Sequence, residues 1–207
     1  MIEYVLASGN KHKLEEINKI VDKFNIKLIM MDEVGLENLK IIEDGETFEE
    51  NSLLKAKTVM DITNLPTIAD DSGLIVDYLN GAPGIYSARY SGENATYETN
   101  NVKLLSELNG VERRKRGAKF VTVITLLFPN NDKIVARGEI IGEISEKERG
   151  DNGFGYDPLF IVKGYNMSFA EMDSNLKNEI SHRARALQEL KIKLKKYYGV
   201  NNENINS

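Results

Sequence analysis

Two adjacent aspartates, Asp70 and Asp71, stand in the stretch IADDSG, directly after the apolar residues Ile68 and Ala69. The apolar residues predict a strand that ends at this acidic pair. Successive side chains of a strand point to opposite faces, so both carboxylates cannot face the core. Two carboxylates in one region of low dielectric constant need a cation, and Mg²⁺ prefers carboxylates, water and phosphate oxygens as ligands. The pair therefore indicates either a divalent metal site or a surface turn in which an aspartate caps the next element.

A second group of polar residues, SGNKHK, follows the first apolar run of the chain and leads into a predicted helix. Ser8, Gly9 and Asn10 would place free backbone N–H groups at the helix N-terminus, where an anion is favoured. Lys13 adds a cation. The alternative is an ordinary helix capped by Asn10. Another acidic patch, Glu43 and Asp44, precedes a helix, and taken alone it indicates a solvated loop.

The stretch NGFGYDP, residues 152–158, places two glycines around one aromatic residue. Gly153 and Gly155 allow a ligand to approach the backbone closely. Phe154 and Tyr156 could offer a stacking face to a nucleobase. The alternative is a tight turn supported by core aromatic side chains.

Three cations lie near the predicted start of the last helix, in the stretch KNEISHRARAL. Lys177, His182 and Arg183 oppose the helix dipole there, and an anion bound between them would offset the unfavourable charge. The alternative for His182 is an ordinary surface or core histidine.

The elements that must position these groups alternate between strand-like and helix-like apolar spacing. Thr47 and Glu50 form a predicted capping box at the start of one helix. Strands are predicted at 2–7, 26–31, 67–69 and 74–79, with a hairpin of 118–128 and 133–144; helices are predicted at 11–24, 47–60, 97–108 and 181–198. The fold class is therefore α/β or mixed α+β. We expect one domain over residues 1–199 and a frayed tail at 200–207.

Composition excludes several classes of function. The 207 residues are 41 % hydrophobic, enough for a core of one domain or two closely joined lobes. A formal net charge of -5 argues against binding to duplex nucleic acid. No cysteine is present, which excludes thiolate nucleophiles, disulfides and cysteine-bound zinc. Without a signal peptide or a long apolar segment, we expect a soluble cytoplasmic protein that binds no membrane.

Taken together, the motifs resemble the inosine-triphosphatase-like family of non-standard purine nucleoside triphosphate pyrophosphatases. The motifs that carry the resemblance occur in order, from about Val5 to Ala186: SGNKHK, EDGETFEEN, IADDSG, GAPGIYSARYSG, GFGYDP and SHR. The resemblance implies an elongated two-lobed α/β fold, with a long central mixed sheet flanked by helices and an active-site cleft between the lobes. It also implies a cytoplasmic homodimer that uses Mg²⁺ to hydrolyse ITP, dITP and XTP to the monophosphate and pyrophosphate.

The same resemblance implies a role for each matching residue. Asp71 would be the general base and a metal ligand, Glu43 a further metal ligand, and Asp70 a structural residue. The substrate would be bound by Ser8, Gly9, Asn10, Lys11, His12, Lys13, Ser72, Phe154, Gly155, Tyr156, Asp157, Lys177, His182 and Arg183.

Two other functions remain as alternatives. One is a non-catalytic purine nucleotide sensor of the same fold. The other is a phosphatase of the aspartyl-phosphate type with Asp70 as nucleophile, although its D-x-D signature is missing because Asp70 and Asp71 are adjacent. The reaction products distinguish the three: pyrophosphate, orthophosphate or nothing.

Overall fold

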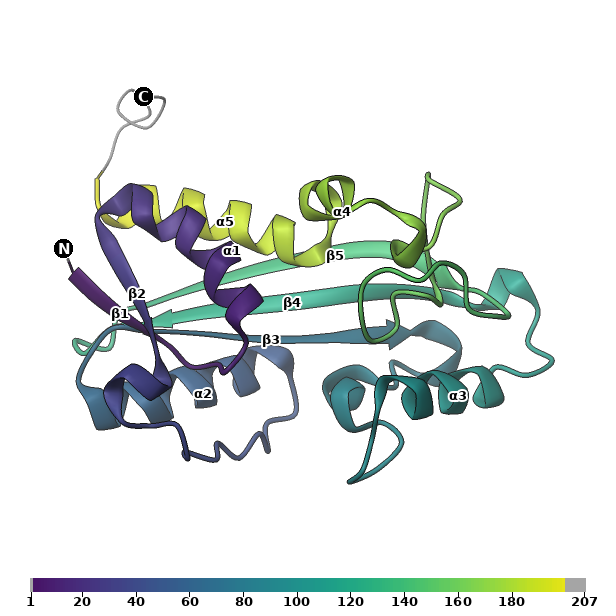
Figure 1. Ribbon diagram of the computed structural model, residues 1–207, viewed down its shortest axis with the longest axis horizontal. Helices are drawn as coiled ribbons and strands as arrows, with labels where there is room; N and C mark the ends of the chain where they lie inside the picture. The colour runs from purple at the N-terminus through teal and green to yellow at the C-terminus, as the bar shows by residue number, and fades with distance from the viewer. Residues whose placement is uncertain (1, 200–207) are drawn as a thin grey trace. The chain divides into compact units, whose positions relative to one another are not determined.

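The computed structural model describes residues 2–199, without the side chain of His12. Its helices and strands follow in the order β1 (Ile2–Leu6), α1 (Lys11–Val21), β2 (Ile26–Met30), α2 (Phe48–Thr63), β3 (Thr67–Val76), α3 (Tyr97–Glu107), β4 (Gly117–Leu127), β5 (Lys133–Ile144), β6 (Phe160–Val162), α4 (Ser174–Ile180) and α5 (His182–Tyr197) (Figure 1). The predicted frayed tail, 200–207, lies outside the described residues. Within the described part of the chain, no helix has the length and apolar character needed to cross a bilayer.

The strands form one mixed sheet in the order β2-β1-β3-β4-β5-β6. Strand β1 pairs in parallel with both β2 and β3, whereas β5 and β6 are antiparallel. The predicted hairpin is present as β4 and β5, which are neighbours in the sheet. Its turn is closed by a hydrogen bond of 2.9 Å from the Phe128 N–H to the Asp132 carbonyl. A mixed sheet flanked by helices confirms the α/β class.

The chain forms two compact units, each built from separate segments. Unit 1 contains the residues up to Asp71, Val123–Arg137 and the residues from Ala186 onward; unit 2 contains Ser72–Thr122 and Gly138–Arg185. A single domain over 1–199 and an active-site cleft between lobes stay predictions.

The core of unit 1 has two layers because the side chains of β1 alternate. Tyr4 and Leu6 pack with α1 and α5, whose buried residues include Ile17 and Leu190. Val5 and Ala7 face the other way and pack against α2. Figure 1 shows α1 and α5 on one side of the sheet and α2 on the opposite side. Because alternate residues of β1 face opposite sides, the strand is held between α1 and α5 on one face and α2 on the other. The loop that follows β1 therefore begins at a fixed place.

The core of unit 2 is rich in aromatic side chains. The ring of Phe120 lies 4.7 Å from that of Phe160 and 5.9 Å from that of Phe169, measured between centroids. Leu104 and Leu108, at the C-terminal end of α3, pack into the same cluster. This cluster supports the segment that carries the GFGYDP motif.

Helix α2 begins at the predicted capping box. The Thr47 hydroxyl accepts a hydrogen bond of 3.1 Å from the Glu50 N–H, and the Glu50 carboxylate accepts one of 3.2 Å from the Thr47 N–H. We expect Thr47→Ala to lower the free energy of unfolding by about 1 kcal/mol, because the Glu50 N–H loses its side-chain acceptor. Urea denaturation measures it. Thr58→Ala removes a hydroxyl inside the same helix and is the control; an equal loss there would contradict the capping assignment.

Two predictions about the elements are wrong. The sequence predicts separate strands at 67–69 and 74–79, with the first ending at the aspartates, but β3 runs without interruption from Thr67 to Val76. Lys177 does not lie at the start of the last helix. It belongs to the separate short helix α4, which begins where the Asp173 carboxylate accepts hydrogen bonds of 2.9 and 3.0 Å from the N–H groups of residues 175 and 176.

Candidate active site

A cavity of about 280 Å³ in unit 1 brings together three of the predicted motifs. Its lining comes from the loop after β1, the first turn of α1, the loop before α2, helix α2 itself and strand β3. The lining residues are Ala7, Ser8, Gly9, Lys13, Leu39, Ile41, Glu43, Lys55 and Asp70. Segments that are far apart in the sequence thus meet around one concave, largely polar space, which is the arrangement expected of a ligand site.

The loop after β1 caps helix α1. The Asn10 side-chain oxygen accepts a hydrogen bond of 3.3 Å from the Lys13 N–H, and the Ser8 hydroxyl accepts one of 3.2 Å from the Asn10 N–H. The first N–H groups of a helix have no partner within the helix, so this end can bind an anion. Gly9, Asn10 and Lys11 are exposed, and the side chain of His12 lies outside the described residues.

The two adjacent aspartates have different partners. The Lys13 ammonium lies 2.7 Å from an Asp70 carboxylate oxygen, and Asp70 is only 3 % exposed. The Lys55 ammonium lies 3.2 Å from an Asp71 carboxylate oxygen. Because each carboxylate has its own lysine, two like charges can stand side by side within a continuous strand. These counterions explain why β3 does not end at the acidic pair.

Lys55 also connects Asp71 with Glu43. The Lys55 Nζ lies 3.0 Å from the Glu43 carboxylate, so two carboxylates converge on one cation. Burial by itself lowers the pKa of Lys55, but attraction to Asp71, Glu43 and Asp70 outweighs it and the net shift is upward. Burial raises the pKa of Asp71; Lys55 opposes this effect and the like charge of Glu43 adds to it. The result is a charged lysine beside a carboxylate that is more basic than usual.

The convergence of Glu43 and Asp71 fits a divalent cation. The second Asp71 oxygen, Oδ2, is buried and makes no hydrogen bond to any part of residues 2–199. Within the same range, no three His, Cys, Asp or Glu side chains are grouped to hold a metal. Mg²⁺ usually binds through one or two carboxylates together with substrate phosphates and water. Two carboxylates and an unpartnered oxygen match that requirement. Asp71 does not line the cavity directly but contacts Lys55, which does.

The GFGYDP motif forms a tight turn in unit 2. The Asp157 carboxylate accepts a hydrogen bond of 2.8 Å from the Phe154 N–H and pairs with the Lys177 ammonium. Gly153 has a φ of 81°, and a Cβ there would lie 2.2 Å from the Asp157 carboxylate. Asp157 is 3 % exposed and therefore holds the turn from inside.

The two aromatic residues of this turn have opposite environments. Phe154 is 53 % exposed, and the Lys177 ammonium lies 4.8 Å from its ring centroid. Tyr156 is 5 % exposed, and its hydroxyl donates a hydrogen bond of 2.8 Å to the Ser87 carbonyl. The structure therefore contradicts the prediction that the Tyr156 ring offers a stacking face. Any contact of Tyr156 with a ligand would come from its backbone.

The remaining predicted residues, Ser72, His182 and Arg183, are half-buried in unit 2. The His182 ring stacks on Phe120 at 4.8 Å between centroids, with an interplanar angle of 13°. The Ser72 hydroxyl bonds to that of Thr122 at 2.8 Å. Ring stacking thus orients His182 and a hydrogen bond orients Ser72, and Arg183 follows directly in the first turn of α5.

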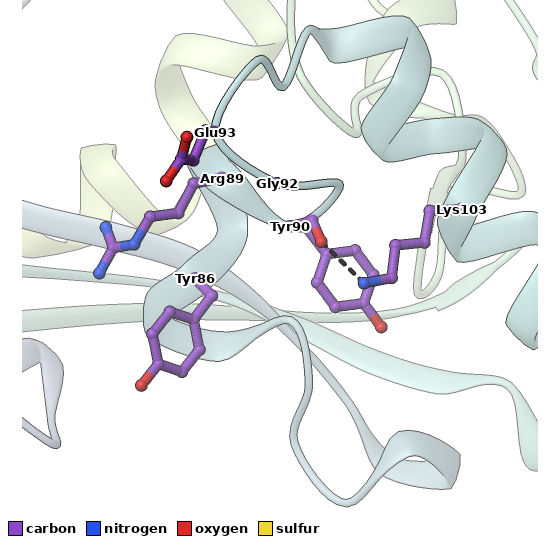
Figure 2. A pocket seen from close by; sticks show the side chains of 6 residues that line it. All are labelled: Tyr86, Arg89, Tyr90, Gly92, Glu93 and Lys103. Atoms are coloured by element: carbon purple, nitrogen blue, oxygen red, sulfur yellow. Dashed lines mark hydrogen bonds between the residues drawn. The ribbon is translucent and has the colours of Figure 1, made fainter.

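Unit 2 has a larger cavity, about 410 Å³, that contains none of the predicted site residues (Figure 2). It is lined by Tyr86, Arg89, Tyr90, Gly92, Glu93 and Lys103. Both cations contact aromatic rings: Arg89 lies 5.1 Å from the Tyr86 centroid and Lys103 lies 4.3 Å from that of Tyr90. Lys103 also donates a hydrogen bond of 2.8 Å to the Tyr90 carbonyl, the dashed line of Figure 2.

Lys55 is the charged residue of the unit 1 cavity that the sequence motifs did not indicate. Its position carried a signal, because it stands three residues after Ser52 and four before Val59, both of which are fully buried. Residues at this spacing share one helix face. A lysine on the buried face of a helix requires an opposite charge, which Asp71 and Glu43 supply.

Comparison with known proteins adds independent evidence. The Ham1 family model matches residues 4–193. A dITP/XTP pyrophosphatase of Clostridium perfringens is 49 % identical over 201 residues, covering 94 % of this chain and 98 % of the relative. One of Geobacter sulfurreducens is 48 % identical over 191 residues, covering 92 % and 96 %. The solved structure of the Staphylococcus aureus Ham1 protein aligns with a TM-score of 0.89 at 40 % identity, over 94 % of this chain and 99 % of that one. A HAM1 protein from Coxiella burnetii aligns with a TM-score of 0.88 at 41 % identity, over 95 % and 100 %.

Proposed function

The chain belongs to the Ham1 family, and we propose that it hydrolyses non-standard purine nucleoside triphosphates to the monophosphate and pyrophosphate. It is a nucleoside triphosphate diphosphatase, and its proposed substrates are ITP, dITP and XTP. The observation that carries the proposal is the unit 1 cavity, where a helix N-terminus with Lys13 lies beside the Glu43 and Lys55 side chains. Such a site can hold a triphosphate and the charge that develops when it is cleaved.

The residues of unit 1 perform the chemistry in this proposal. A water molecule forms a bond to the α-phosphorus while the bond from that phosphorus to the bridging oxygen breaks. Asp71 accepts the proton of the water, and the raised pKa of its carboxyl favours this role. Lys13 and the N–H groups around Asn10 stabilise the departing pyrophosphate. The chemistry that Mg²⁺ supplies, when held by Glu43 and Asp71, is neutralisation of phosphate charge and acidification of water.

Recognition of the purine ring involves residues of unit 2 in this proposal. We propose that Phe154 stacks on the purine and that His182 and Arg183 donate hydrogen bonds to its 6-oxygen, beside Ser72, Asp157 and Lys177. Arg183 can only donate. Adenine has an amino group at the 6-position, so a donor facing it would stay unpaired, and ATP should be a poor substrate. The contacts with the nucleotide would be completed by Lys11, Lys177 and the backbone of residues 154–157.

The cofactor, the partners and the cellular location are further parts of the proposal, and they rest on membership of the family. Mg²⁺ suits the two carboxylates and the phosphate ligands of the substrate. We propose that the protein acts as a cytoplasmic homodimer and binds neither nucleic acid nor membranes. The acidic net charge of -5 supports the absence of nucleic-acid binding.

A nucleotide panel with Mg²⁺, followed by phosphorus NMR, tests the proposed function. We expect ITP, dITP and XTP to yield monophosphate and pyrophosphate in one step, with no diphosphate intermediate. Early accumulation of IDP and orthophosphate would refute the proposal and favour a phosphatase. Tight ITP binding with no product would favour the nucleotide sensor.

The exposed ring of Phe154 gives a second prediction. We expect Phe154→Ala to raise the KM for ITP by about tenfold, because one base–aromatic stacking contact is lost. The value of kcat and the melting temperature should stay unchanged, since Phe154 is 53 % exposed and its backbone N–H still bonds to Asp157. Tyr165→Ala removes another exposed aromatic ring of unit 2 and is the control. Steady-state kinetics of both variants decides; an unchanged KM for Phe154→Ala would remove Phe154 from base binding.

A further inference from the structure

Asn51 lies in the first turns of α2 and is fully buried, with 0 % exposure. Its side-chain oxygen accepts a hydrogen bond of 2.9 Å from the Gly45 N–H. Gly45 stands two residues after Glu43, in the loop that precedes the helix. The Asn51 amide therefore ties the loop that carries Glu43 to the body of α2.

The close approach of this loop depends on Gly45. A Cβ added at Gly45 would lie 2.8 Å from the Asn51 side-chain oxygen and 2.8 Å from the Glu50 Cβ. Both distances are too short for real contacts, so any larger residue would displace the loop from Asn51. Contact between Gly45 and the buried Asn51 amide therefore helps to fix the loop that carries Glu43.

The nitrogen of the Asn51 amide belongs to the helix face from which Lys55 contacts Asp71. Within residues 2–199, the Asn51 Nδ2 is buried without a hydrogen-bond partner, and so is the Asp71 Oδ2. A buried N–H without a partner is unfavourable. Such an N–H on the helix face that presents Lys55 to Asp71, whose Oδ2 also lacks a partner, points to a role in holding that carboxylate.

We infer that Asn51 is a positioning residue for the Glu43–Asp71 carboxylate pair, holding the Glu43 loop through its oxygen and Asp71 through its nitrogen. Lys55 stands four residues later on the same helix face and contacts both carboxylates. One face of α2 thus sets the distance between Glu43, which lies in the loop before the helix, and Asp71, which lies in β3. This inference goes beyond the proposed function but rests on it, since the pair is the proposed metal site.

The test measures metal affinity on the full chain, independently of turnover. Mn²⁺ is titrated into protein saturated with the α,β-methylene analogue of ITP, and bound Mn²⁺ is read from its EPR spectrum. Asn51→Leu keeps the approximate volume and removes both polar halves of the amide. We expect its Mn²⁺ Kd to rise by at least about tenfold, as for other residues that orient metal ligands. Gly45→Ala keeps Asn51 but displaces the loop, and it should show a similar rise.

Ser52→Ala is the matched control. Ser52 is the next residue, is equally buried, and bonds to the Thr125 hydroxyl at 2.7 Å and to the Glu49 carbonyl at 3.1 Å, away from the carboxylate pair. Loss of the Ser52 hydroxyl should lower the melting temperature and leave the Mn²⁺ Kd unchanged. An unchanged Kd in Asn51→Leu, an equal rise in Ser52→Ala, or no Mn²⁺ binding by the wild type would each overturn the inference. If the wild type releases pyrophosphate and Asn51→Leu keeps its Mn²⁺ affinity, the inference fails while the proposed function stands.

Discussion

Asp71→Asn is expected to lower kcat for ITP by about 10³-fold, with a change in KM of only a few fold. The substitution keeps the shape of the side chain but removes the group that accepts the proton of the attacking water. It also removes one of the two charges proposed to hold Mg²⁺. Both contributions act mainly in the transition state, so kcat should fall far more than nucleotide affinity. Steady-state kinetics at saturating Mg²⁺ measures the effect.

The melting temperature of Asp71→Asn should not fall. Burial raises the pKa of Asp71, which means that the folded protein holds its ionised form less favourably than the unfolded chain does. Replacement of the carboxylate by a neutral amide removes that cost. Loss of activity with retained stability would separate a catalytic role from a structural one.

Asp70→Asn is the matched control for this prediction. Asp70 stands next to Asp71 in β3, but it is 3 % exposed and paired with Lys13. We expect its substitution to lower the free energy of unfolding by about 1–3 kcal/mol, because a buried charged hydrogen bond is lost. Its kcat should change much less than that of Asp71→Asn. Near-normal turnover of Asp71→Asn together with loss of turnover in Asp70→Asn would reverse the two assignments.

Lys55→Met is expected to lower kcat/KM for ITP by about 10²-fold and the free energy of unfolding by about 2 kcal/mol. Methionine replaces most of the apolar stem but not the ammonium group, so Glu43 and Asp71 would face each other without a cation. If these carboxylates form the metal site, Mg²⁺ can replace the missing charge. Added Mg²⁺ should therefore raise the melting temperature of Lys55→Met more than that of the wild type.

Lys57→Met provides the control on the same helix. Lys57 pairs with Asp61 at 2.7 Å, but both side chains are more than half exposed, at 58 % and 51 %. Surface pairs of this kind contribute little to stability, so neither the unfolding free energy nor kcat/KM should change appreciably. Equal responses of the two variants to Mg²⁺ would contradict a metal site at Glu43 and Asp71.

Local features were predictable because their causes are short-range in the sequence. The capping box at Thr47 involves residues three positions apart, and the structure shows it where the sequence predicts it. The hairpin of β4 and β5 follows from two apolar runs and the turn between them. The motifs that carry chemistry keep their order along the chain, and this order together with the residue types is sufficient to indicate the family and its reaction.

The tertiary structure alone decided how the charges are paired. Asp70 and Lys13 are 57 positions apart in the sequence, and Asp71 and Lys55 are 16 apart. Without knowledge of these partners, two adjacent aspartates predicted the end of a strand; with them, β3 continues to Val76. Burial was decided in the same way, since Phe154 and Tyr156 are two residues apart but only one reaches solvent. An ion pair or a buried ring exists only after distant elements pack together, and spacing along the chain does not contain that distance.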